Sequence, residues 1–227
     1  FARMRAEGSM KGITANSYVK MMPHTSASNI SLFFRTKGRV IPTSSACTSG
    51  SQGIGYSYEV IKYGKIPVMI AGGAEELCVT EAAVFDVMYA ASRLNNTPHL
   101  SPKPFDQNRD GLVIGEGAGT LILEDLEHAQ ARGAKIYAEM IGFGTNSNGT
   151  HITQPCPDSM EVAIREALKD ANLAPEDIGY VNAHATATDL GDIAESIATA
   201  KVFGKKIPIS SLKSYMGHTL GASGSLE

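Results

Sequence analysis

The sequence predicts an α/β protein in which strands and helices alternate along the chain. Apolar runs of strand length are separated by longer segments with helical periodicity, and this pattern recurs through both halves of the 227 residues. The 23 glycines and the 43% hydrophobic content suit closely packed layers around a substantial core. Alternation of this kind favours parallel strand pairing, with helices covering both faces of each sheet.

The expected elements divide the chain into two halves that meet near Gly133, where a charged helix ends. We therefore assign residues 1–133 to an N-terminal half and residues 134–227 to a C-terminal half. The first half is expected to contain helix 26–35, strand 39–44, helix 48–63, strand 67–71, helix 80–91, strand 112–124 and helix 125–132. The second is expected to contain strand 135–144, helix 159–171, strand 178–182, helix 192–202, strand 207–210 and a helix that begins near Gly217.

Three glycines, Gly115, Gly117 and Gly119, occupy alternate positions of the expected strand 112–124. Alternate residues of a strand share one face, so another segment is expected to pack directly against the backbone there. The run lacks both the Lys-Ser/Thr ending of a P-loop and the spacing of a dinucleotide fingerprint. Close packing is therefore a better interpretation than phosphate binding.

Composition excludes several classes of protein. The net charge is −3 and no block of Lys and Arg offers a footprint for phosphates, so we expect no nucleic acid partner. Three widely spaced cysteines predict neither a disulfide framework nor a zinc knuckle, and they fit a reducing compartment such as the cytoplasm. No run reaches transmembrane length, and the first residues do not resemble a signal peptide. Because the chain lacks an initiator Met and stops within an expected helix, we expect both ends to be cut.

Cys47 follows a β-prone run and precedes a helical pattern, within the sequence Ser-Ala-Cys-Thr-Ser-Gly. A cysteine at such a junction sits on a sharp turn facing the amides of a helix N-terminus, which favours the thiolate. Small neighbours allow a substrate to approach, as in the nucleophile elbow of hydrolases. The alternative is an inert, buried thiol.

Two later stretches repeat the pattern of small residues around a reactive side chain at the end of a strand. One contains His184, and the other contains Lys213 and His218. Because ligands gather at the carboxyl ends of strands in α/β sheets, these side chains are expected to meet Cys47 in one reaction centre.

Together these motifs resemble the β-ketoacyl-[acyl carrier protein] synthases of types I and II. The matching stretches are Ser-Ala-Cys-Thr-Ser-Gly, Ala-Gly-Gly-Ala-Glu-Glu (71–76), Arg-Asp-Gly (109–111), Gly-Glu-Gly-Ala-Gly (115–119), Asn-Ala-His-x-Thr-x-Thr (182–188) and Lys-Ser-x-x-Gly-His-x-x-Gly-Ala-x-Gly (213–224). The resemblance implies a thiolase-like, five-layered αβαβα fold of two similar halves, incomplete here at both ends. It also implies a homodimer.

The reaction implied by the resemblance is a decarboxylating Claisen condensation between an acyl-enzyme and malonyl-acyl carrier protein. Cys47 is then the nucleophile, while His184 and His218 donate hydrogen bonds to the enolate oxygen. Lys213, held by Glu195, tunes the site and lowers the pKa of the cysteine. No cofactor and no catalytic metal are implied.

The remaining implied roles concern support and binding. They are support of the centre (Glu195, Asp192), contact with the pantetheine arm (Thr186, Thr188), lining of the acyl pocket (Phe85) and ligation of a structural cation (Asn182, Glu227). The sequence departs from the family pattern His-Gly-Thr-Ser-Thr-Pro at Ala185, Ala187 and Asp189. Two other functions stay open: a thiolase, or a catalytically silent partner subunit of the chain-length-factor type.

Overall fold

The structure is a computed structural model that describes residues 2–11, 13–151 and 153–227. The chain divides into two compact units, residues 1–44 and 45–227. The first unit contains α1 (Ala2–Glu7), α2 (Ala15–Val19) and α3 (Thr25–Phe34), so the expected helix 26–35 is confirmed. The expected strand 39–44 is wrong: within the described part of this unit the segment has no strand partner and forms no ladder.

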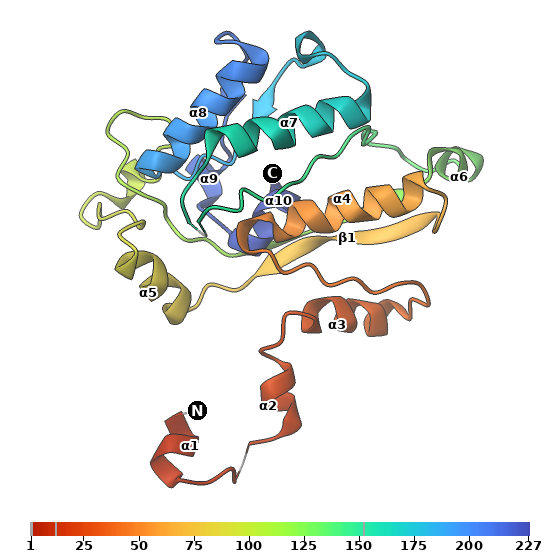
Figure 1. Cartoon of the computed structure of the whole chain (residues 1–227). Helices are drawn as coiled ribbons and strands as arrows, with labels where there is room; N and C mark the ends of the chain where they lie inside the picture. Colours follow the sequence, from red (N-terminus) through yellow and green to blue (C-terminus); the bar gives the residue numbers. More distant parts are fainter. Residues whose placement is uncertain (1, 12, 152) are drawn as a thin grey trace. The chain divides into compact units, whose positions relative to one another are not determined.

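The larger unit contains an antiparallel pair of strands, β1 (Val68–Glu75) and β2 (Gly117–Glu124), in the register Val68↔Glu124. The expectation of parallel pairing is wrong here, because the long connection between the strands carries the chain back along β1 in the opposite direction. That connection contains α5 (Val79–Val87) and η2 (Pro98–Leu100). Helix α4 (Ser49–Lys62) runs along β1 (Figure 1).

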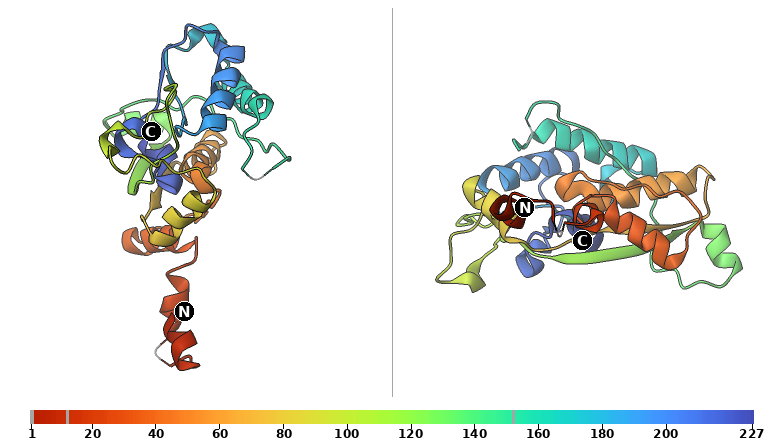
Figure 2. Two further views of the ribbon diagram at one scale, coloured as in Figure 1. Left: turned by 90° about the vertical axis from the view of Figure 1, so that its left-hand side faces the viewer. Right: turned by 90° about the horizontal axis from the view of Figure 1, so that it is seen from below.

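The second pair of strands is parallel, as expected, and consists of β3 (Val181–Asn182) and β4 (Ile209–Ser210). The helices α7 (Pro157–Ala171) and α8 (Asp189–Phe203) pack against each other beside it, as two views show (Figures 1 and 2). The shorter elements are η1 (Ala46–Thr48), α6 (Leu126–Ala131), η3 (Pro175–Asp177), α9 (Lys213–Met216), η4 (Leu220–Ala222) and α10 (Ser223–Leu226).

Residues 135–144 do not form the expected strand. They are held by side chains and by α7 instead of by a ladder: Tyr58 Oη donates to the Ile141 carbonyl oxygen at 2.9 Å, and the Phe143 N–H donates to Asp170 Oδ2 at 3.1 Å. A β-prone segment becomes a strand only where a neighbour completes its hydrogen bonds, and none does so among the described residues.

The three alternating glycines meet the end of the chain, as their alternation predicts; Gly117 and Gly119 lie in β2, and Gly115 precedes it. A Cβ atom added at Gly115 would lie 2.5 Å from the Met216 carbonyl oxygen, and one added at Gly119 would lie 2.7 Å from that of Ser225. The backbone of residues 216–226 therefore packs against bare backbone of the segment 115–119. This contact carries His218 into the centre of the larger unit.

Within the described residues, no helix has the length and apolar character needed to cross a membrane.

Candidate active site

Cys47 lies in the 3-10 turn η1 that leads directly into α4. The residue before it, Ala46, has a φ of 51°, a left-handed value that is uncommon for a residue with a side chain. Side-chain bonds close the turn, because the Ser45 N–H donates to Ser49 Oγ at 2.9 Å and Ser49 Oγ donates to the Ala46 carbonyl oxygen at 2.7 Å. The predicted sharp junction is present, and it leaves the thiol half-buried.

The electrostatic setting of Cys47 differs from the expectation of a favoured thiolate. Burial raises the pKa of the Cys47 thiol above its usual value, while its own backbone N–H and the positive charge of Lys213 act in the opposite direction. Removing the sulfur from water outweighs both stabilising effects. The thiol is therefore the resting form.

His218 lies directly beside the sulfur. Its Nε2 is 3.0 Å from Cys47 Sγ, and the ring is almost completely buried, with 2% of the residue exposed. The Leu220 N–H donates to Nδ1 at 3.3 Å, which places the ring proton on Nε2. Burial and the charge of Lys213 lower the pKa of His218 to about 3. His218 is thus a neutral hydrogen-bond donor that points at the sulfur.

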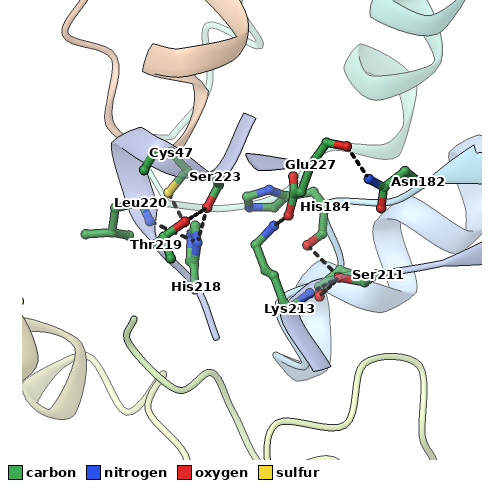
Figure 3. A network of polar contacts seen from close by, with 12 residues as sticks. Cys47, Asn182, His184, Ser211, Lys213, His218, Thr219, Leu220, Ser223 and Glu227 are labelled. Atoms are coloured by element: carbon green, nitrogen blue, oxygen red, sulfur yellow. Dashed lines mark hydrogen bonds and ion pairs between the residues drawn. The ribbon is translucent and has the colours of Figure 1, made fainter. Parts of the chain in front are cut away.

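His184 completes a cluster of three side chains. The sulfur of Cys47 and one ring nitrogen from each histidine all lie within 4.8 Å of one another, and the two imidazole rings meet edge to face at 5.1 Å. His184 keeps contact with solvent, but protein encloses its other sides. This partial desolvation, followed by the charges of Lys213 and His218, lowers its pKa well below the usual value. The predicted convergence of Cys47, His184 and His218 is therefore what the structure shows (Figure 3).

Lys213 is fully buried and forms an ion pair with the carboxylate of Glu227 (Figure 3). The expectation that Glu195 holds Lys213 is wrong. Glu195 instead accepts the backbone N–H groups of His184 at 2.8 Å and Ala185 at 2.6 Å. These amides take up both carboxylate oxygens, so Glu195 fixes the loop of His184 and reaches Lys213 only through its charge.

One short segment, residues 109–115, holds the loops of both histidines. The Gly111 N–H donates to the Ala187 carbonyl oxygen at 3.0 Å, and Arg109 Nε donates to that of Thr188 at 3.1 Å. At its other end, the Gly115 N–H donates to the His218 carbonyl oxygen at 2.9 Å. These bonds fix the backbone of both histidine loops to one segment of the chain.

The buried carboxylate of Asp192 links the same parts. It accepts the Phe105 N–H at 2.8 Å and the Ala187 N–H at 3.1 Å, and it lies 3.7 Å from Arg109 Nε. The Arg109 guanidinium also binds the carbonyl and the carboxylate of Asp189. The departure from the family pattern at Asp189 therefore adds a charged partner for Arg109.

Two family models together cover most of the chain. The N-terminal domain of the β-ketoacyl synthases matches residues 3–129, and their C-terminal domain matches residues 137–227. The chain belongs to the β-ketoacyl synthase family.

Curated members of this β-ketoacyl synthase family share its sequence over most of the chain. A 3-oxoacyl-[acyl-carrier-protein] synthase 2 of Vibrio harveyi is 43% identical over 208 residues, which are 88% of this chain and 50% of that protein. A 3-oxoacyl-[acyl-carrier-protein] synthase 1 of Haemophilus influenzae is 40% identical over 226 residues, 99% of this chain and 55% of that protein. The chain thus spans about half the length of these relatives.

Solved structures of ketoacyl synthases have the same fold. A β-ketoacyl synthase from Burkholderia phymatum is 62% identical and superimposes with a TM-score of 0.97, covering 100% of this chain and 55% of that one. A ketosynthase solved in complex with a type II acyl-carrier protein is 37% identical, with a TM-score of 0.89, over 94% of this chain and 54% of that one. The predicted thiolase-like α/β fold is confirmed.

Not every residue expected at the ketoacyl synthase site contacts the cluster. The Thr186 and Thr188 hydroxyls bond to each other at 2.9 Å, and no hydrogen bond among the described residues links them to Cys47 or the histidines. Phe85 lies half-buried in α5. Asn182 donates from Nδ2 to the Glu227 carbonyl oxygen at 3.0 Å, which brings the two expected cation ligands together.

Sequence reasoning missed Ser223, which forms part of the site. Its Oγ lies 3.0 Å from His218 Nδ1 and 3.2 Å from Thr219 Oγ1, and the residue is fully buried. The signal was present, because Ser223 follows His218 by five residues inside the Gly-Ala-x-Gly motif.

Proposed function

We propose that this chain carries the reaction centre of a 3-oxoacyl-[acyl carrier protein] synthase, an acyltransferase that extends a fatty-acyl or polyketide chain. The observation that carries the proposal is the 3.0 Å contact between the Cys47 sulfur and His218 Nε2, with a ring nitrogen of His184 in the same cluster. One nucleophile and two neutral hydrogen-bond donors are what a condensation through an enolate requires.

In the first half-reaction, the Cys47 sulfur attacks the carbonyl carbon of an acyl thioester carried by acyl carrier protein. The carbon–sulfur bond to the carrier breaks, and the carrier thiolate takes up the proton that the cysteine lost. The backbone N–H of Cys47 stabilises the tetrahedral oxyanion. Because burial keeps the cysteine protonated, the Nε2–H of His218 assists by donating to the sulfur as negative charge develops.

In the second half-reaction, a malonyl-carrier loses CO₂ and leaves an enolate. His184 and His218 each donate an N–H to the enolate oxygen, and they can do so because their lowered pKa values keep them neutral. The enolate carbon then attacks the carbonyl of acyl-Cys47 as the 3-oxoacyl-carrier forms, and the sulfur leaves as a thiolate that regains a proton from solvent. Every atom of the two thioesters is accounted for in the product, the free carrier and CO₂.

The surrounding residues position these groups. Lys213 supplies positive charge near the cluster, while Glu195 and Asp192 fix the loop that carries His184. We assign Thr186 and Thr188 to the pantetheine arm and Phe85 to the acyl chain, on the strength of the motif match.

The expected structural cation has a suitable site. Asn182 Oδ1 is buried and has no hydrogen-bond partner among the described residues, as expected for an oxygen that an alkali cation would ligate. The backbone carbonyl of Glu227 accepts a hydrogen bond from Asn182 Nδ2, while its carboxylate pairs with Lys213. The cation would stabilise the fold without entering the reaction.

The proposal also covers organisation and partners. We propose acyl carrier protein as the macromolecular partner, a homodimer as the assembly and the cytoplasm as the location, with neither nucleic acid nor membrane as a partner. The three free cysteines fit a reducing compartment. The boundary at residues 133 and 134 is supported by the family models, which end at 129 and resume at 137.

Mass spectrometry after incubation with an acyl-carrier thioester tests this function. We expect an acyl adduct on Cys47 that malonyl-carrier then converts to a 3-oxoacyl product, with no adduct on a Cys47→Ala variant. Cys78→Ser and Cys156→Ser variants are the matched controls and keep the adduct. Failure to acylate Cys47 would favour the silent partner subunit, and turnover with acyl-coenzyme A alone would favour a thiolase.

A further inference from the structure

The cluster of Cys47, His184 and His218 has the donor set of a zinc site. Zinc binds thiolate sulfur at about 2.3 Å and imidazole nitrogen at about 2.0–2.1 Å, which places tetrahedral donors about 3.3–3.6 Å apart. In this cluster, Cys47 Sγ lies 3.0 Å from His218 Nε2, and all three donor atoms lie within 4.8 Å of one another. These distances bracket the spacing that zinc requires. His184 is the solvent-exposed member, so its ring can turn to adjust the geometry.

We propose that Cys47, His184 and His218 form a binding site for one thiophilic divalent cation of the zinc class, which occupies the cluster in place of substrate. Binding replaces the thiol proton by the metal: the sulfur–hydrogen bond breaks, a sulfur–metal bond forms and one proton goes to solvent. Soft sulfur with two imidazoles selects zinc or cadmium over magnesium or calcium, which prefer oxygen. A metal-bound sulfur cannot attack a thioester, so the cation inhibits acylation.

Ser223 supplies the outer partner that a metal-bound histidine needs. Coordination through His218 Nε2 moves the ring proton to Nδ1, where it requires an acceptor. Ser223 Oγ is 3.0 Å from Nδ1, and Thr219 Oγ1 can receive the serine proton at 3.2 Å. With a proton on Nδ1, His218 can no longer accept the hydrogen bond from the Leu220 N–H. At 3.3 Å, this bond is the longer of the two contacts to Nδ1.

The charges around the cluster tolerate a cation. The positive charge of Lys213 acts on all three members of the cluster, but its ion pair with Glu227 offsets that charge. Glu75, whose Oε2 accepts the Gly221 N–H at 3.1 Å, adds negative charge near the sulfur. Since His184 is exposed, water or chloride can reach the fourth coordination position.

Calorimetry with Zn²⁺ and ultraviolet titration with Cd²⁺ test the site in the absence of any substrate. The protein carries Cys78→Ser and Cys156→Ser, so that the thiolate-to-cadmium charge-transfer band reports Cys47 alone. Both replaced residues are helix N-caps, a position that suits serine. We expect one metal ion per chain, protection of Cys47 from iodoacetamide, and loss of binding in Cys47→Ala.

Two serines of the C-terminal helix provide a matched pair. Ser223→Ala is expected to weaken zinc binding about tenfold, the usual effect of losing the partner of a metal-bound histidine. Ser225→Ala is expected to bind as tightly as the parent, since the hydrogen bonds that Ser225 Oγ donates within the described residues go to the carbonyls of Ala222 and Gly73. Metal that stays bound after Cys47→Ala, or equal affinity in both serine variants, would overturn the proposal. Neither result depends on whether the chain catalyses condensation.

Discussion

The backbone N–H of Gly115 donates to the carbonyl oxygen of His218 at 2.9 Å, and the His218 N–H donates to the carbonyl oxygen of Val113 at 2.7 Å. These two bonds form an isolated parallel bridge that fixes the backbone of the buried histidine. Main-chain hydrogen bonds therefore fix the backbone of His218 independently of the contacts that its side chain makes. The position of His218 depends on the absence of a side chain at residue 115.

Replacing Gly115 by Ala is expected to lower the free energy of unfolding by about 1–3 kcal/mol, the usual cost of overpacking. The new Cβ atom would lie 2.5 Å from the Met216 carbonyl oxygen, which the backbone cannot easily move away from. Gly179→Ala is the control, because a Cβ atom there meets nothing within 4 Å. Urea denaturation measures both, and equal stability of the two variants would show that the 216–218 segment is not tightly held.

Arg109→Lys is expected to destabilise the fold by about 1–3 kcal/mol, because a lysine cannot reproduce the bonds of the guanidinium to Thr188 and Asp189. It should also slow decarboxylation by loosening the loop of His184. Arg165→Lys tests the same exchange in a half-exposed ion pair with Glu161, where a change below about 0.5 kcal/mol is expected. Similar losses of unfolding free energy in both variants would show that the hydrogen bonds of Arg109 contribute no more than an exposed ion pair.

Lys213→Met is expected to cost about 3–5 kcal/mol, since it leaves the Glu227 carboxylate in a largely buried position without its partner. Adding Glu227→Gln should restore part of that loss by removing the unpaired charge. Lys169→Met is the control, because Lys169 is 77% exposed and should change stability by no more than about 1 kcal/mol. A double variant as unstable as Lys213→Met would argue that the ion pair is not the source of the effect.

The two half-buried cysteines should react with iodoacetamide over different pH ranges. The thiolate is the reactive form, so a raised pKa moves the rate of alkylation to higher pH and a lowered pKa moves it to lower pH. Burial raises the pKa of Cys47, whereas a backbone hydrogen bond from Ser159 lowers that of Cys156. We expect alkylation of Cys156 to reach half its maximal rate at the lower pH.

Peptide-resolved mass spectrometry across a pH series gives both curves from one protein. The pH of the half-maximal rate is compared, because the maximal rates also depend on access. If Cys47 titrates at the lower pH, the field of Lys213 and the local amides outweigh burial, and the thiolate is the resting form after all.

The members of the cluster around Cys47 could be predicted from sequence because each lies in a motif of small residues that surround one reactive side chain. Cys47, His184 and His218 come from three separate segments. The motifs identified them, although residues 39–44 before Cys47 do not form the strand that was expected to position it. The partner of Lys213 could not be predicted in this way. Both Glu195 and Glu227 are within reach along the chain, and only the amides of His184 and Ala185, which occupy Glu195, decide between them.

The fold was predicted more reliably in its helices than in its strands. Helices α4 and α7 follow their own periodicity and begin within two residues of the expected positions. Residues 135–144 have the composition of a strand, but no neighbouring strand pairs with them among the described residues. Composition alone does not reveal whether such a partner strand exists. The antiparallel pairing of β1 with β2 was missed for a related reason, because alternation of elements does not reveal the direction in which a long connection returns the chain.

The segment 109–115 is attached to the His184 loop at one end and to the His218 loop at the other. A proteolytic cut inside it would separate the two attachments, so that one loop could loosen without the other. Each loop would then depend on its remaining contacts, Glu195 for His184 and Ser223 for His218.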